Sequence, residues 1–134
     1  MPNVNALIML DKSKEYLKIA EIAFDHELYN PVAQAAYYAC FQLACVALDY
    51  HKNEIYPISS VRNCTHKGII SGFVRYLINE NQIVPIDLRG YLKELESFRI
   101  TADYEAVSSI DRVTAEKILQ KALYFYRRVT ESLS

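Results

Sequence analysis

The amino-acid sequence predicts an all-α fold, an up-and-down bundle of about five helices that forms a single domain over residues 1–134. Residues that break helices are scarce, with three glycines and four prolines in 134 residues. Most segments repeat apolar residues every three or four positions, which is the spacing of one helix face. An uncharged run at residues 31–48 contains no glycine and favours a helix bundle over a β-rich fold. As one domain, a chain of this length buries roughly two-thirds of its unfolded surface.

The first helix is predicted at about residues 5–26. Its inward positions recur at intervals of three and four, whereas its charged residues fall mainly on other faces. These inward residues are Leu10, Ser13, Leu17, Ala20 and Phe24. A short turn at residues 28–30 leads into the next helix.

The uncharged run at residues 31–48 predicts the central helix of the bundle, which ends near residues 49–51. Asn30 is suited to cap its first turn, and Pro31 fits there because the first N–H groups of a helix lack an intrahelical acceptor. Six alanines in the run supply helix propensity. Because the helix is apolar on nearly every side, it must be covered all round, by its own chain or by a second copy.

Residues 52–64 are predicted as a loop, because Pro57 prevents a simple continuation of the central helix. Thr65 is a good N-cap for a third helix. The inward stripe of that helix consists of His66, Ile69, Ile70, Phe73 and Leu77. Gly68 and Gly72 are poor helix formers, which either let a neighbouring group come close or weaken the prediction.

Two more helices complete the predicted bundle. Residues 79–85 break the chain, and a fourth helix follows at about residues 86–104. One line of this helix carries Leu88, Leu92, Leu95, Arg99 and Ala102. After a connector at residues 105–113, Thr114 caps a final helix. The inward residues of the final helix are Ala115, Ile118, Ala122, Phe125 and Val129.

Charge and composition limit the classes of protein to which this sequence can belong. The formal net charge of −1 argues against nucleic-acid binding through bulk charge, although a local basic face is compatible with it. The start of the chain lacks a basic leader, and the central run carries two glutamines and two tyrosines, which is typical of a buried helix rather than a membrane span. The cysteines (Cys40, Cys45 and Cys64) include no Cys-x-x-Cys pair and favour reduced thiols. We expect a cytoplasmic protein without a membrane span.

Arg99 is the first candidate site residue, because it lies on an otherwise apolar line of the fourth helix. Glu96 lies one turn before it and Asp103 one turn after it, so both can pair with the guanidinium along one face. An arginine held by these carboxylates is the more ordinary interpretation. The functional interpretation is that Arg99 binds a phosphate, because the N–H donors of its planar guanidinium match the phosphate oxygens.

His66 is the second candidate, since it begins the inward stripe of the third helix. The ordinary interpretation is a partly buried histidine bonded to a carbonyl or carboxylate, and the functional one is a general acid or base. Cys64 and His66 are two potential metal ligands, but no further ligands follow at a suitable spacing, so no metal site is predicted.

The last helix carries a third candidate, a face with basic residues and one aromatic residue. This face consists of Lys117, Lys121, Tyr124 and Arg128. Such a face can track a phosphate backbone and stack a base. A solvated outer face is the more ordinary interpretation.

Three short segments carry a family resemblance. They are Ala36-Tyr37-Tyr38-Ala39-Cys40-Phe41, Thr65-His66-Lys67-Gly68 and Arg99-Ile100-Thr101-Ala102-Asp103-Tyr104, followed by Ala122 and Phe125. In their order and spacing they resemble the HEPN domain family of prokaryotes, in its small stand-alone branch, over nearly the whole chain. The resemblance implies a bundle of about five helices, commonly a homodimer with a cleft between protomers.

The resemblance also implies a range of functions. Many HEPN proteins are metal-independent ribonucleases or ribonuclease toxins, whose usual site is an arginine followed a few residues later by a histidine. Others are paired with an MNT-type nucleotidyltransferase, which acts as antitoxin and in some systems adds nucleotides to a tyrosine. Arg99 matches the arginine and Tyr104 the tyrosine, but Asp103 and Glu105 stand where the histidine is expected. His66 is the imidazole that can replace it from another helix.

These observations together predict a dimeric HEPN-like protein that acts on or binds RNA within a toxin–antitoxin or defence-type pair. Its regulator is expected to be a nucleotidyltransferase, and no cofactor is predicted. The candidate catalytic residues are Arg99, His66 and Asp103, and Tyr104 is the candidate for nucleotide addition or binding. The alternative is a non-catalytic module that binds RNA, a nucleotide or another protein, in which Arg99 belongs to a structural ion pair.

Overall fold

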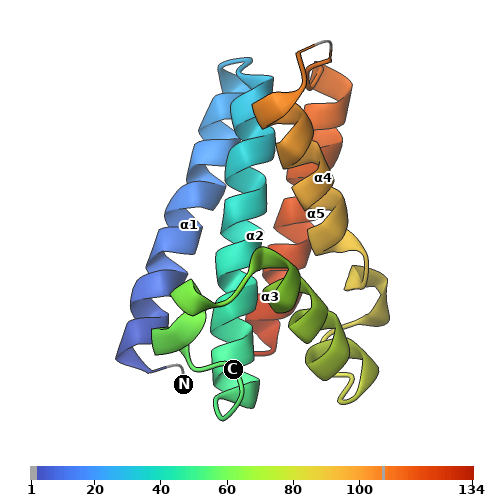
Figure 1. Ribbon diagram of the computed structural model, residues 1–134. Coiled ribbons are helices and arrows are strands. Elements are labelled where there is room, and N and C mark those ends of the chain that lie inside the picture. The colour runs from blue at the N-terminus through green and yellow to red at the C-terminus, as the bar shows by residue number, and fades with distance from the viewer. Residues whose placement is uncertain (1–2, 107) are drawn as a thin grey trace.

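In the computed structural model, four long helices run up and down beside one another, and a shorter helix packs across them (Figure 1). The structure describes residues 3–106 and 108–134. The α-helices of this part of the chain are α1 (Val4–Asp25), α2 (Tyr29–Lys52), α3 (His66–Gly72), α4 (Tyr91–Tyr104) and α5 (Arg112–Glu131). The connections hold two 3-10 helices, η1 (Ile58–Asn63) and η3 (Ile86–Leu88), and a π-helical segment, η2 (Phe73–Asn79). No strand occurs in the described ranges, so the predicted all-α class is confirmed.

Helix α2 is the centre of the bundle and packs against α1, α4 and α5. Most of its side chains are buried, including those on opposite sides of the helix. Alanines at these contacts let the neighbouring helix backbones come close. The protein's own helices therefore cover α2, and no second copy is needed to bury it.

By length and composition alone, α2 is also apolar enough to cross a membrane. However, 72% of its most apolar window is buried inside the protein. That degree of burial is typical of the core helix of a bundle, as the sequence predicts.

The start of α2 differs from the prediction. The cap position is occupied by Leu28, which makes no side-chain cap hydrogen bond. The side-chain oxygen of Asn30 instead accepts a hydrogen bond from the backbone N–H of Ile110, at 2.9 Å. The prediction of Asn30 as a cap is wrong because a contact with the segment before α5 uses its oxygen.

Of the two other predicted N-caps, one is confirmed and one is wrong. Thr65 is the N-cap of α3, since its side chain accepts from the N–H of Gly68, and this prediction is confirmed. Helix α5 begins three residues earlier than predicted, and its N-cap is Asp111. The Asp111 side chain accepts from the N–H of Thr114 at 2.8 Å, so the prediction of Thr114 as the cap is wrong. Both residues have side chains suited to capping, and the local sequence does not decide between them.

The third and fourth helices also have different bounds from those predicted. The third is continued by the π-helical η2, and the fourth is shortened because residues 86–88 form η3 and α4 starts only at Tyr91. Gly72, the last residue of α3, faces the ring of Tyr56 so closely that a Cβ atom there would overlap it. The close-approach interpretation of Gly72 is therefore correct.

A buried hydrogen bond connects the first and last helices of the bundle. The hydroxyls of Ser13 and Tyr126 lie 2.6 Å apart, and the Ser13 hydroxyl also lies 2.9 Å from the carbonyl of Leu10, to which it donates. With the Ser13 hydrogen directed to Leu10, Tyr126 is the donor between α1 and α5. Ser13 is fully buried, so this bond is shielded from water.

We expect Tyr126→Phe to lower the free energy of unfolding by about 1 kcal/mol, because it removes this bond and little packing. Urea unfolding followed by circular dichroism measures the change. The matched control is Tyr104→Phe, since Tyr104 is 75% exposed and should leave stability unchanged. Equal stability of the two variants would contradict the assignment.

Candidate functional site

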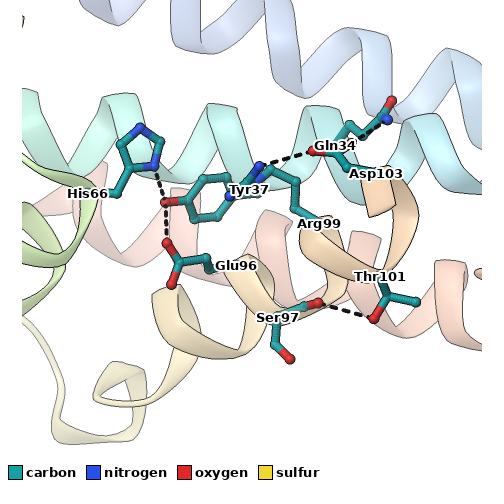
Figure 2. Close-up of polar contacts among 8 residues, drawn as sticks. All are labelled: Gln34, Tyr37, His66, Glu96, Ser97, Arg99, Thr101 and Asp103. Atoms are coloured by element: carbon teal, nitrogen blue, oxygen red, sulfur yellow. Dashed lines mark hydrogen bonds and ion pairs between the residues drawn. The ribbon is translucent and has the colours of Figure 1, made fainter. Parts of the chain in front are cut away.

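Side chains from α2, α3 and α4 meet around Tyr37, which lies at the middle of α2 and is fully buried (Figure 2). His66, the first residue of α3, and Glu96 of α4 lie at the hydroxyl end of its ring. Arg99 of α4 lies over the ring, with its Cζ 5.2 Å from the ring centroid. The structure thus brings two predicted residues to one aromatic side chain, with Arg99 over its ring and His66 at its hydroxyl.

The hydroxyl of Tyr37 bridges His66 and Glu96. It lies 2.8 Å from Nδ1 of His66 and 3.4 Å from Oε2 of Glu96. Burial, and secondly the charge of Glu96, raise the pKa of this hydroxyl far above its usual value, so it keeps its hydrogen at neutral pH. A hydroxyl that donates to Glu96 can only accept from His66, and that arrangement leaves Nε2 of His66 as the basic nitrogen.

His66 is held in place by aromatic contacts as well. Its ring stacks on Phe41 with centroids 4.1 Å apart and meets the edge of Tyr38 at 6.5 Å. Burial lowers the pKa of His66, the positive charge of Arg99 lowers it further, and Glu96 opposes this. The imidazole is therefore neutral at pH 7, which is the form that a general base requires.

Arg99 forms an ion pair with only one of its two predicted partners. Its Nη1 lies 3.0 Å from Oδ2 of Asp103, whose Oδ1 accepts a hydrogen bond from Nε2 of Gln34 at 2.6 Å. The side chains of Arg99 and Asp103 are 13% and 20% exposed. Among the described residues Arg99 makes no ion pair with Glu96, because that carboxylate faces the Tyr37 hydroxyl instead.

The guanidinium of Arg99 keeps donors that the fold does not use. Its Nε is buried and has no hydrogen-bond partner within residues 3–106 and 108–134. Over the same residues its Nη2 also makes no hydrogen bond. A phosphate oxygen is a suitable acceptor for the Nη2 donors, because a charge-assisted bond to an anion is stronger than a neutral one.

Sequence reasoning missed two members of this cluster, the Tyr37 hydroxyl as a bridge and Gln34 as a support for Asp103. A signal for Gln34 was present, because Gln34 and Gln42 are the strongly polar side chains of an otherwise apolar helix. A polar group that a buried helix retains usually has a partner or a ligand.

Tyr104 and the basic face of α5 lie outside this cluster. Tyr104 is 75% exposed at the end of α4. On α5, Lys117 and Lys121 lie 3.9 and 3.3 Å from the carboxylate of Glu94. No hydrogen bond or ion pair within the described ranges links these residues to Arg99 or His66.

The second half of the basic face is also paired. The hydroxyl of Tyr124 donates to Asp87 at 2.6 Å and accepts from Nη1 of Arg128 at 3.1 Å. Arg128 also lies 3.3 Å from Glu131. The four predicted residues therefore share one face of α5, but carboxylates accompany its cations and reduce its attraction for phosphate.

Metal ligands do not gather in the part of the chain that the structure describes, where no three His, Cys, Asp or Glu side chains form a cluster. The three cysteines are free thiols, with Cys40 and Cys45 buried and Cys64 partly exposed. Burial raises the pKa of Cys45 to about 12 and makes it unreactive.

The protein is thus a helical bundle in which a tyrosine of the central helix contacts an arginine over its ring and an imidazole at its hydroxyl. The family model for the HEPN domain matches residues 6–133, and the chain belongs to the HEPN domain family. It is similar to two proteins of Methanocaldococcus jannaschii. One, named "Putative toxin MJ0142", is 27% identical over 125 residues, covering 93% of this chain and 79% of the relative. The other, "Putative toxin MJ0605", is 30% identical over 132 residues, covering 93% and 86%.

Proposed function

We propose that this HEPN protein is a toxin that acts on RNA, with Arg99 as the phosphate-binding group and His66 as the proton carrier. The observation that carries the proposal is that Arg99 and His66 both contact Tyr37, Arg99 over its ring and His66 at its hydroxyl. The names of the two relatives support the toxin role, and the family supports RNA as the target.

The proposed reaction is an internal transfer at a phosphodiester. The 2′-oxygen of one nucleotide attacks the adjacent phosphorus as Nε2 of His66 takes the 2′-hydroxyl proton. The bond from phosphorus to the 5′-oxygen then breaks, and that oxygen takes up a proton from the imidazolium. The products are a 2′,3′-cyclic phosphate and a 5′-hydroxyl end, and His66 is neutral again. Arg99 stabilises the negative charge that develops on the phosphoryl oxygens.

Asp103 has a different role from the one its place among the candidate catalytic residues suggests. It is bonded to Arg99 on one side and to Gln34 on the other. In the proposal it is a positioning residue that orients the guanidinium, and it does not transfer the proton.

The partners are part of the same proposal. The family resemblance suggests a homodimer and control by an MNT-type nucleotidyltransferase that acts as antitoxin. Tyr104 is the proposed target, and its exposure of 75% leaves the hydroxyl accessible to a second protein. Its oxygen would attack the α-phosphorus of a nucleoside triphosphate, lose its proton and release pyrophosphate. The basic face of α5, in which Lys117 is exposed and the other three residues are half-buried, is a secondary candidate for RNA contact.

A second candidate function is a non-catalytic module that binds RNA or a protein. The observation that favours it is the pairing of Arg99 with Asp103 at 3.0 Å, at an exposure of only 13% for the arginine side chain. An arginine already neutralised in this way is typical of a structural ion pair.

Incubation of the purified protein with 5′-labelled single-stranded and structured RNAs, in the presence of EDTA, distinguishes the two functions. The proposal expects products with a 2′,3′-cyclic phosphate end, which mass spectrometry identifies. RNA that binds without being cleaved would support the module, and a protein that neither binds nor cleaves any of the RNAs would refute both RNA functions.

The pH dependence of cleavage tests His66 separately. Its pKa is lowered from the usual 6.5, so the base form predominates at pH 6.5 and above and is lost as the pH falls through the lowered value. We expect the single-turnover rate to be constant from about pH 6.5 to 8 and to fall in acid with an apparent pKa below 6.5. His66→Gln should abolish this acid limb together with most of the rate, and His26→Gln, an exposed histidine outside the site, should change neither. An unchanged acid limb in His66→Gln would contradict the assignment.

A further inference from the structure

A recess of about 270 Å³ lies beside His66, where α1, α2 and the segment before α3 meet. Phe41, Tyr38 and His66 supply aromatic walls, and Gln42, Arg62 and Cys64 also line it. The ring of Tyr38 also lies 5.9 Å from the guanidinium carbon of Arg99. The recess and Arg99 are therefore joined through one aromatic side chain. The phosphate chemistry described above does not use this recess.

Two polar side chains that line the recess have groups without a partner among the described residues. Oε1 of Gln42 is buried and lacks a hydrogen-bond partner in the described ranges, although Gln42 lies on the apolar central helix. Arg62 is exposed and makes no ion pair with any residue that the structure describes. A buried unpaired amide oxygen costs free energy, which a ligand N–H can recover. Rotation of the terminal amide toward the recess breaks no existing hydrogen bond.

We propose that the recess binds one unstacked nucleobase of a single-stranded RNA whose neighbouring phosphate lies on Arg99. This inference rests on the proposed function and names its substrate as unpaired RNA. The aromatic walls suit the faces of a base, and the amide of Gln42 suits its hydrogen-bonding edge. Arg62 binds the phosphate on the other side of the same nucleotide.

The geometry favours a strand over a duplex or a free nucleotide. A base within a duplex is stacked and paired, so it cannot enter a side recess unless it is flipped out. Arg62 lines the recess itself, whereas Arg99 lies beyond Tyr38. One cation in the lining and a second next to Tyr38 match a nucleotide with a phosphate on each side, as occurs inside a strand.

Protection of Cys64 from alkylation tests whether the recess is occupied. Cys64 lines the recess and is partly exposed, whereas Cys40 and Cys45 are buried. The full chain is treated with N-ethylmaleimide alone, with a ten-nucleotide single-stranded RNA, with the same sequence as a duplex, and with AMP. We expect the single strand to slow the modification of Cys64 about tenfold, and the duplex and AMP to leave its rate unchanged. Protection by AMP to the same extent would overturn the assignment to a strand.

Variants test the recess independently of the phosphate chemistry. We expect Gln42→Leu and Arg62→Gln each to raise the Kd for single-stranded RNA about tenfold. The melting temperature of Gln42→Leu should not fall, because the amide oxygen that it removes has no partner. The matched control is Arg75→Gln, which removes the same charge from an exposed position of η2 and should leave the Kd unchanged.

The outcomes separate this inference from the proposed function. Cleavage that depends on Arg99, with Cys64 unprotected and the two recess variants equal to wild type, would overturn the recess and leave the function standing. Absence of both binding and cleavage in the wild-type protein would overturn both. Protection of Cys64 by RNA without cleavage would support the recess and favour the non-catalytic module.

Discussion

Replacing Arg99 by alanine is expected to lower the rate of RNA cleavage by about 10²–10³-fold, the usual loss when a group that stabilises developing charge is removed. The guanidinium is fixed over Tyr37 and paired with Asp103, so in the proposed reaction its Nη2 is already oriented for a phosphoryl oxygen. Little of this geometry has to form during the reaction. The effect should therefore appear in kcat more than in KM.

Single-turnover and steady-state cleavage assays measure this loss, and Arg99→Lys is the informative companion. Lysine keeps the charge but lacks the planar fork, so we expect it to recover only a small part of the rate. Asp103→Asn keeps the shape of the side chain but removes the negative charge that pairs with Arg99. The loss of cleavage rate in this variant should be smaller than the loss in Arg99→Ala. Circular dichroism establishes that each variant is folded. A folded Arg99→Ala protein with the wild-type rate would refute Arg99 as the phosphate-binding group.

Asp49→Ala is expected to produce the largest loss of stability among the polar substitutions, about 3 kcal/mol in the free energy of unfolding. The side chain is 3% exposed and accepts hydrogen bonds from Asn3, Asn53 and the backbone N–H of Ile58, at 2.9, 2.9 and 2.8 Å. Alanine leaves all three donors without this acceptor. The N-terminus of α1, the end of α2 and the start of η1 then lose their common anchor.

Urea unfolding at pH 7 measures this change, with Asp25→Ala as the control. Asp25 is an exposed aspartate at the end of α1, so its replacement should change stability by no more than about 0.5 kcal/mol. Asp49→Asn keeps an acceptor oxygen and should lie between wild type and alanine. If Asp49→Ala is as stable as the control, the three hydrogen bonds contribute nothing net to folding.

Local sequence patterns are sufficient to predict the fold class, the central position of α2 and two residues of the candidate cluster around Tyr37. These features can be predicted from local sequence, because apolar spacing identifies a helix face and the scarcity of glycine and proline permits long helices. Arg99 and His66 stood out for the same reason, as polar residues on lines that are otherwise apolar. The resemblance of three short segments then indicated the family, which the match over residues 6–133 established.

Only the tertiary structure decided the partners of these residues. His66 is bonded to Tyr37, 29 positions away, and Asp103 to Gln34, 69 positions away. Helix spacing predicts which residues share a face, but it does not predict which face of another helix lies opposite. For the same reason Asn30 was assigned to a cap although it bonds Ile110, and the recess beside His66 could not be predicted. Contacts between distant segments depend on how the helices pack, and the local pattern does not contain that information.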